Sequence, residues 1–109
     1  MIKEIEPGKL YQVKIGGVFV CMLDESGCLV KRWTANPGDI LLALSTEKKT
    51  DYIRAHGTTE LTHVWSAAFL YEEKVVHVIS DDSRYEQSLL HQYRGYLTRH
   101  ITKLERSPT

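Results

Sequence analysis

The sequence is poor in the residues that mark specialised classes of protein. Its 109 residues include two cysteines, three prolines and seven glycines, too few for a disulfide-stapled, disordered or fibrous chain. No run approaches the roughly 18 apolar residues of a membrane-spanning helix, and the first residues lack the apolar stretch of a signal peptide. These absences predict a cytoplasmic protein without membrane contact, folded as a single domain over residues 1–109.

Net charge is lacking too, because 14 basic residues balance 14 acidic residues. This balance weakens the case for a strongly basic nucleic-acid binder, a polybasic membrane anchor or an acidic DNA mimic. From residue 84 onward, however, five Lys and Arg residues accompany only two Glu residues. The C-terminal part is therefore mildly basic and the rest mildly acidic.

Motifs for catalysis and metal binding are also missing. The five histidines show no His-x-x-x-His spacing and the cysteines form no Cys-x-x-Cys pair, so we predict neither a metal site nor a cofactor. No serine or cysteine lies in a nucleophile elbow, which indicates a protein that is not an enzyme. Cys21 lies in an apolar run and is expected to fill the core, with Cys21 and Cys28 both reduced.

The sequence does contain a series of short β-prone segments separated by turn signals. Tyr11, Val13 and Ile15 alternate with polar residues, as in a half-buried strand, whereas 18–23 is a continuous apolar run that should be covered on both faces. The segment 46–60 loses this periodicity and is predicted to be the longest loop. The expected strands are residues 10–15, 18–23, 28–35, 40–45, 61–71 and 74–80, the last two forming a hairpin.

The pattern becomes helical near residue 82. Ser83 and Glu86 fit a capping box, and apolar residues then recur on one face of a helix over 82–106. That face holds Tyr85, Leu89, Leu90, Tyr93, Tyr96, Leu97, Ile101 and Leu104. We therefore predict a mainly β fold with one C-terminal α-helix: a small antiparallel SH3-like barrel or β-roll over residues 7–80, closed by the amphipathic helix.

Two stretches resemble the small SH3-like barrel proteins that tailed bacteriophages encode. Residues 37–44, Pro-Gly-Asp followed by aliphatic residues, are similar to a strand entry of those proteins, and residues 69–79 are similar to their closing hairpin. With the opening residues 7–11, the likeness spans residues 7–80. The resemblance implies a barrel and a phage accessory protein of the host cytoplasm, and it carries over no active-site residue.

Binding residues are sought first on the polar face of the predicted helix. Arg84, His91, Arg99 and Arg106 recur there at seven- and eight-residue intervals, with Arg94 nearby, and could contact an acidic protein or a phosphate backbone. A solvated helix face would show the same pattern.

Aromatic residues offer a second possible surface. Trp33 and Trp65 lie on separate strands, and an exposed tryptophan near Tyr52 or Tyr71 would form a stacking or peptide-binding platform. Core packing is the competing interpretation for at least one of them, because a small barrel needs large apolar side chains.

The favoured interpretation of the sequence is a non-enzymatic protein-binding module, and the resemblance implies a phage factor that modulates a host protein. One alternative is a nucleic-acid-binding barrel, which requires the basic helix face to converge with Lys48 and Lys49. A second alternative is a small-molecule enzyme with a site of unfamiliar pattern. A homodimer also fits an exposed helix face.

Overall fold

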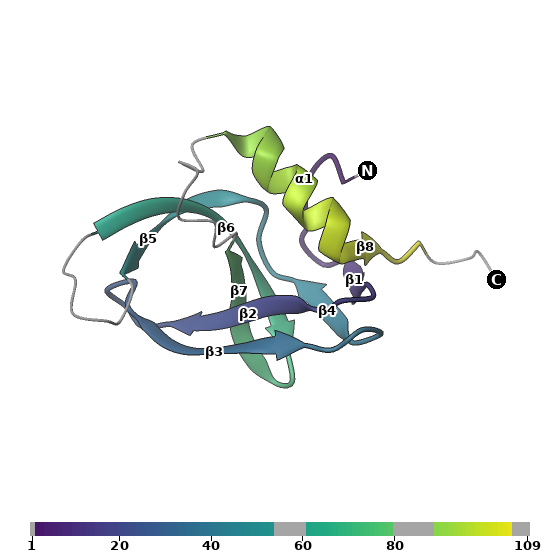
Figure 1. The fold of residues 1–109 in the computed structure, drawn as a ribbon, viewed down its shortest axis with the longest axis horizontal. Helices are drawn as coiled ribbons and strands as arrows, with labels where there is room; N and C mark the ends of the chain where they lie inside the picture. The colour runs from purple at the N-terminus through teal and green to yellow at the C-terminus, as the bar shows by residue number, and fades with distance from the viewer. Residues whose placement is uncertain (1, 54–60, 80–88, 106–109) are drawn as a thin grey trace.

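The structure, a computed structural model, describes residues 2–53, 61–79 and 89–105. Within these ranges the chain is mainly β with one helix (Figure 1). The strands are β1 (Leu10–Val13), β2 (Val18–Leu23), β3 (Leu29–Ala35), β4 (Ile40–Ala43), β5 (Lys48–Ile53), β6 (Leu61–Tyr71), β7 (Lys74–Ile79) and β8 (Ile101–Lys103), and the helix is α1 (Leu90–His100). No helix among the described residues is long and apolar enough to cross a membrane.

The strands form one antiparallel sheet in the order β3-β2-β7-β6-β4-β1-β8, and β5 pairs with β6 beside this path. Strand β6 has 11 residues; its first half pairs with β5, its second half pairs with β4, and β7 lies along its other edge. Curvature of the sheet brings the β2–β3 turn back to β5, since a Cβ atom on Gly27 would clash with the carbonyl oxygen of Asp51.

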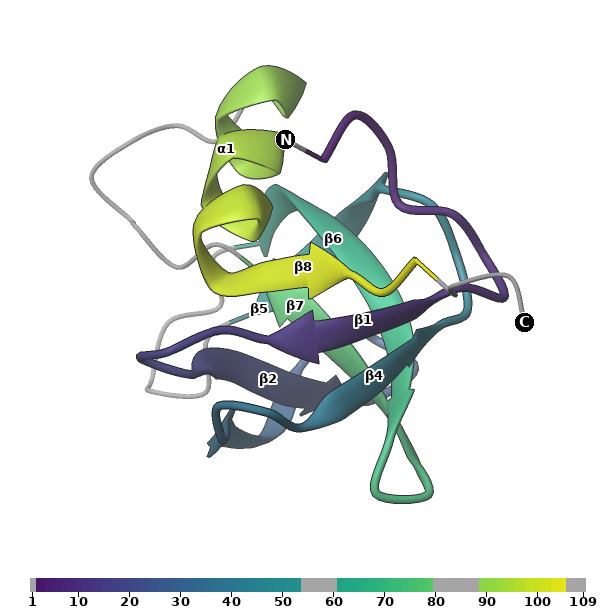
Figure 2. The same cartoon turned by 90° about the vertical axis from the view of Figure 1, so that its right-hand side faces the viewer.

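The core lies on the inner face of this curved sheet. Alternate strand residues point inward, as the pleat requires, and the rings of Tyr11 and Phe69 meet edge to face with centroids 5.9 Å apart. Helix α1 contributes Tyr93 and Leu97, both almost completely buried. Figures 1 and 2 show α1 lying over one side of the sheet and running directly into β8.

Most predicted strands are confirmed to within two residues, and so is the predicted hairpin, in which Ala68 lies opposite His77. Cys21 and Cys28 are both thiols, and Cys21 is buried, as predicted. The expectation that residues 18–23 are covered on both faces was wrong for Phe19, which is 50% exposed on the outer face.

The prediction of a loop over residues 46–60 was wrong in its first half, where β5 pairs with β6 from Lys48 opposite Ser66 to Ile53 opposite Leu61. The sequence hid this strand because Lys48, Lys49 and Asp51 are exposed charged residues, which interrupt the apolar and polar alternation of a strand. Backbone hydrogen bonds to β6 hold the strand instead. Residues 54–60 of the predicted loop lie outside the described residues.

The predicted helix over 82–106 is also corrected, because α1 ends at His100 and Ile101 has extended backbone angles. Ile101–Lys103 instead pairs with β1, from Val13 opposite Ile101 to Tyr11 opposite Lys103. Two β-branched residues, Ile101 and Thr102, favour the strand, and β1 offers ladder hydrogen bonds that a helix would leave unused. The predicted cap and residues 82–88 lie outside the described residues.

Candidate functional site

The polar face of the helix is described only in part. His91 and Arg99 are exposed on α1, as predicted, whereas Arg84 and Arg106 lie outside the described residues. A Cβ atom on Gly95 would meet no described atom within 4 Å. No close contact with the described part of the chain therefore accounts for a glycine at this position.

Arg94 was predicted to bind a partner, but its partly exposed guanidinium is paired with a buried carboxylate of the same chain. Its Nε and Nη2 atoms donate to Glu47 Oε2 at 3.0 and 2.8 Å, and the Glu47 side chain is only 1% exposed. The other carboxylate oxygen of Glu47 accepts the backbone N–H of Ile5. This pair fastens α1 to the residue before β5 and to the N-terminal segment, so we assign Arg94 a structural role.

The structure brings together one of the predicted aromatic pairs, Trp33 and Tyr71, but it does not leave an exposed aromatic platform. Trp33 and Trp65 are both half-buried against the core, and Tyr52 is buried rather than exposed. Trp33 stacks on Tyr71 with ring centroids 6.4 Å apart and planes at 24°, and Lys31 Nζ lies over the Trp33 ring, 4.8 Å from its centroid. Trp33 therefore completes the core near Tyr71, while Tyr52 belongs to a separate cluster.

Two ionisable groups, Tyr71 and His77, have pKa values shifted mainly by burial. Burial, followed by hydrogen bonding to Asp39, raises the pKa of Tyr71 well above its ordinary value. Burial and the nearby charge of Lys48 lower the pKa of His77. Within the described ranges, no three His, Cys, Asp or Glu residues are grouped so that they could hold a metal ion.

An exposed row of aliphatic side chains crosses the outer face of the sheet. Leu10 lies opposite Leu42, Leu42 opposite Leu70, and Leu70 opposite Val75, so the four share one face of β1, β4, β6 and β7. Leu104 extends the row beyond β1, because its amide donates to the carbonyl of Leu10 at 2.9 Å. We call these five residues the aliphatic row.

The aliphatic row is open to solvent over most of its length. Leu10, Leu70, Val75 and Leu104 are 43%, 38%, 54% and 36% exposed, and Leu42 is half-buried. Adjacent strands lie about 4.8 Å apart, so the row spans roughly 19 Å. Figure 2 shows β8, β1 and β4 side by side, with the β6–β7 hairpin reaching beyond them.

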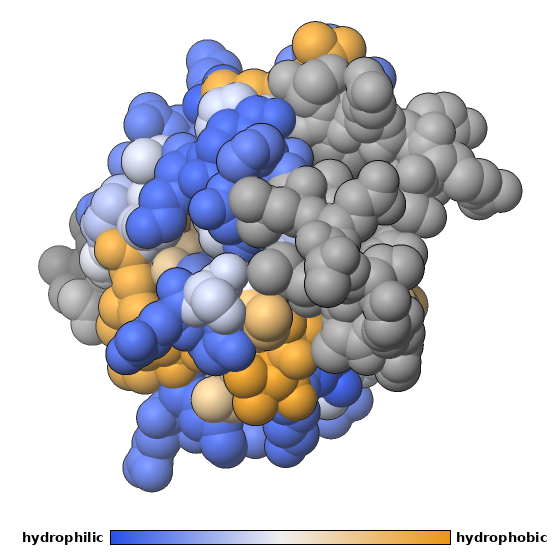
Figure 3. Space-filling view, turned by 90° about the vertical axis from the view of Figure 1, so that its left-hand side faces the viewer, coloured by the Kyte–Doolittle hydropathy of each residue, from blue (hydrophilic) through white to orange (hydrophobic). Residues whose placement is uncertain are grey.

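Other exposed apolar residues lie next to the row and elsewhere. Ile40 shares the outer face of β4 with Leu42 and is 41% exposed, and Leu44, the residue after β4, is 43% exposed. Figure 3, which views the side where β5 lies in Figure 1, shows apolar atoms gathered among hydrophilic ones there as well. The register across five strands, and not exposure alone, distinguishes the aliphatic row.

Sequence reasoning missed the aliphatic row for an identifiable reason. The predicted inner face of the first strand was correct for Tyr11 and Val13 but wrong for Ile15, which lies beyond the end of β1 and is 95% exposed. Leu10 was not separated from the polar residues that follow it. Residues 40–43 are apolar at every position, so periodicity could not assign Leu41 and Leu42 to different faces. One signal was available: neighbouring strands carry apolar residues at the positions of both faces, so a second apolar face could have been expected.

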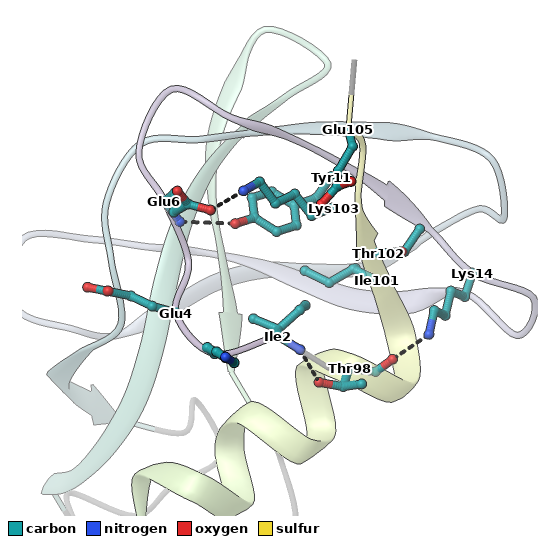
Figure 4. A pocket seen from close by; sticks show the side chains of 11 residues that line it. Ile2, Glu4, Glu6, Tyr11, Lys14, Thr98, Ile101, Thr102, Lys103 and Glu105 are labelled. Carbon is teal, nitrogen blue, oxygen red and sulfur yellow. Dashed lines mark hydrogen bonds and ion pairs between the residues drawn. The ribbon is translucent and has the colours of Figure 1, made fainter. Parts of the chain in front are cut away.

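A second feature is a cavity beside β8 (Figure 4). Its volume is about 690 Å³, and it lies between the N-terminal segment, residues 2–6, and the strand with the preceding helix end. Two contacts bridge it: the backbone N–H of Ile2 donates to Thr98 Oγ1 at 3.0 Å, and Lys103 forms an ion pair with Glu6. We call this cavity the β8 slot.

The comparisons with known proteins identify no relative: no family model, curated protein or solved structure matches the chain.

Proposed function

We propose that the chain is a non-enzymatic protein-binding module that docks on its partner through the aliphatic row. The row carries the proposal because five aliphatic residues are aligned across the sheet and left in contact with water. Contiguous exposed apolar surface of this kind is typical of protein interaction sites, where its burial supplies binding free energy.

A protein is a better partner for this surface than a nucleic acid. The aliphatic row has no charged member, whereas binding to a phosphate backbone relies on Lys and Arg contacts. Lys49 lies over the ring of Trp65, with Nζ 5.1 Å from its centroid, and not beside the row. The uncharged row therefore supports the choice of a protein partner.

We also propose that the curved sheet is an SH3-like barrel closed by α1. Two features support this assignment: β6 is long enough to pair with both β4 and β5, and the β2–β3 turn at Gly27 touches β5 at Asp51. The sequence resemblance supports a phage accessory protein that acts on a host protein in the cytoplasm.

The experiment compares two identical substitutions on exposed strand residues. Val75→Glu places a charge in the aliphatic row, and Val30→Glu places one on β3, where Val30 is 63% exposed and lies outside the row. Tagged full-length proteins are used to capture partners from a bacterial lysate treated with nuclease. We expect one stoichiometric protein to bind the wild type and Val30→Glu, and its recovery to fall at least tenfold with Val75→Glu.

Equal recovery by both variants would contradict the proposed docking surface. Recovery that disappears after nuclease treatment would instead indicate a nucleic acid. Sedimentation of the purified chain covers the remaining case: a wild-type dimer that Val75→Glu converts to a monomer would identify the partner as a second copy.

A further inference from the structure

Strand β8 forms one edge of the sheet, and only one side of it is paired. Toward β1, the carbonyl of His100 accepts the Lys14 amide at 2.8 Å, and the Leu104 amide donates to Leu10 at 2.9 Å. Backbone groups of a strand alternate in direction, so those of Ile101, Lys103 and Glu105 face the opposite side.

Most of these outward-facing groups have no partner among residues 2–53, 61–79 and 89–105. The Ile101 amide bonds to the carbonyl of Leu97 at the end of α1. In the described part of the chain, the carbonyls of Ile101 and Lys103 and the amides of Lys103 and Glu105 have no hydrogen-bond partner. Ile101 is fully buried, so the accessible part of this edge lies at Lys103 and Glu105, whose donors and acceptor another extended chain can pair with.

The β8 slot lies along this unpaired edge, where Figure 4 shows side chains from both walls pointing into it. Its volume of about 690 Å³ lies in the range of about 300–1,000 Å³ that is usual for ligand sites. Ile2, which is half-buried, lines it with apolar surface that an added strand would contact, whereas Ile101 is fully buried in the core behind it. A length of about five residues matches the extent from Ile101 to Glu105 at about 3.3 Å per residue.

The charges around the slot indicate what could fill it. Three lysines and three glutamates line it, so it has no net charge and does not favour an anionic ligand such as a nucleotide. Two of these charges nevertheless lie at opposite ends of the slot, a positive one at the start of β8 and a negative one beyond its end. Lys14 lies beside the start of β8, where its Nζ donates to the carbonyl of Thr98 at 2.6 Å, and Glu105 lies beyond the other end.

We propose that the β8 slot binds an extended peptide segment that adds to the sheet antiparallel to β8. An antiparallel segment begins beside Glu105 and ends beside Lys14, so a basic residue at its start and an acidic residue at its end complement the slot. Main-chain hydrogen bonds to Lys103 and Glu105 supply the affinity, and the two flanking charges set the direction. This site is separate from the outward-facing side chains of the aliphatic row and does not depend on the proposed function.

The test uses a capped seven-residue peptide with lysine first, glutamate last and alternating threonine and valine between them. It is titrated into the full-length, isotope-labelled chain while amide resonances are followed by NMR. We expect the amides of Lys103 and Glu105 to shift and to become protected from hydrogen exchange. A peptide with the two end charges exchanged should bind about three- to tenfold more weakly.

Two protein variants separate the contribution of the Lys103 backbone N–H to peptide binding from that of the Lys103 side chain. Lys103→Pro removes the outward N–H without removing a bond to β1, because proline is tolerated where the N–H of an edge strand faces solvent. Lys103→Ala removes the ion pair with Glu6 and keeps the N–H. We expect Lys103→Pro to weaken peptide binding about tenfold or more and Lys103→Ala to change it less than threefold.

Modified peptides keep the test decisive if Lys103→Pro does not fold. Methylation of one alternating set of peptide amides should abolish binding, and methylation of the other set should leave it within a fewfold, because only one set faces β8. No shift at Lys103 and Glu105 at millimolar peptide would overturn the proposal, as would equal binding of both methylated peptides. A dimer of the unliganded chain that pairs through β8 would overturn it in favour of a second copy.

Discussion

The inner and outer faces of the same strands carry similar apolar side chains but differ strongly in how far those side chains are buried. In β4, Leu41 is fully buried and Leu42 is half-buried; in β6, Phe69 is fully buried and Leu70 is 38% exposed. The inner residues meet α1 and the other strands, whereas the aliphatic row has no described element over it. Similar side chains therefore serve the core on one face and are available for binding on the other.

The largest effect should come from the inner face of β6. Phe69→Ala removes a fully buried ring that meets Tyr11 edge to face, so we expect a loss of about 3 to 5 kcal/mol in unfolding free energy. Leu70→Ala, one residue further along the strand, should cost less than about 1 kcal/mol. Urea unfolding measures both, and equal losses would remove the distinction between the two faces.

The helix provides the next test, because its apolar side covers the inner face. Leu97 is fully buried, and Leu97→Ala should lower the unfolding free energy by about 2 to 4 kcal/mol. Thermal unfolding with a matched Leu89→Ala variant, in which the replaced side chain is 47% exposed, provides the control. A loss at Leu97 no larger than at Leu89 would mean that α1 does not dock on the sheet.

Two arginines of α1 extend the comparison to charged groups. Arg94→Ala leaves the Glu47 carboxylate buried without its ion-pair partner, and we expect a loss of about 2 to 3 kcal/mol because Arg94 itself is partly exposed. Arg99→Ala changes an exposed residue and should alter stability by about 0.5 kcal/mol or less. Chemical unfolding of both variants at neutral pH tests this difference. Similar losses would refute the structural role of Arg94.

The sequence predicted much of the fold, because six strands carry strong β-forming runs with turn residues between them. It also identified Tyr93 and Leu97 correctly as buried helix residues. Strand β5 could not be predicted, because its charged residues hide the β pattern and the pairing that forms it comes from β6, a later segment of the chain. The end of α1 was missed for the same reason: β8 depends on the open edge of β1, which periodicity does not report.

The candidate sites were less predictable than the fold. Residue types suggested Arg94 and Tyr52 as binding residues, yet burial of Glu47 beside one and packing around the other depend on tertiary contacts. Conversely, Leu10 and Val75 looked like ordinary strand residues, and only their register joins them in the aliphatic row. A surface defined by register across five strands requires the three-dimensional pairing.

The smallest effect is expected on the outer face of β7, where two adjacent valines allow the same substitution on each face. Val75 is 54% exposed in the aliphatic row, so Val75→Thr keeps the shape and lets water solvate the new hydroxyl; stability should change by less than about 0.5 kcal/mol. Val76 is fully buried, and Val76→Thr places a hydroxyl in the core at a cost of about 1 to 3 kcal/mol. Parallel thermal unfolding of the two variants measures the difference. If Val75→Thr proved as destabilising as Val76→Thr, the outer face would be packed against another surface in solution, and a self-associated form would have to replace the exposed aliphatic row.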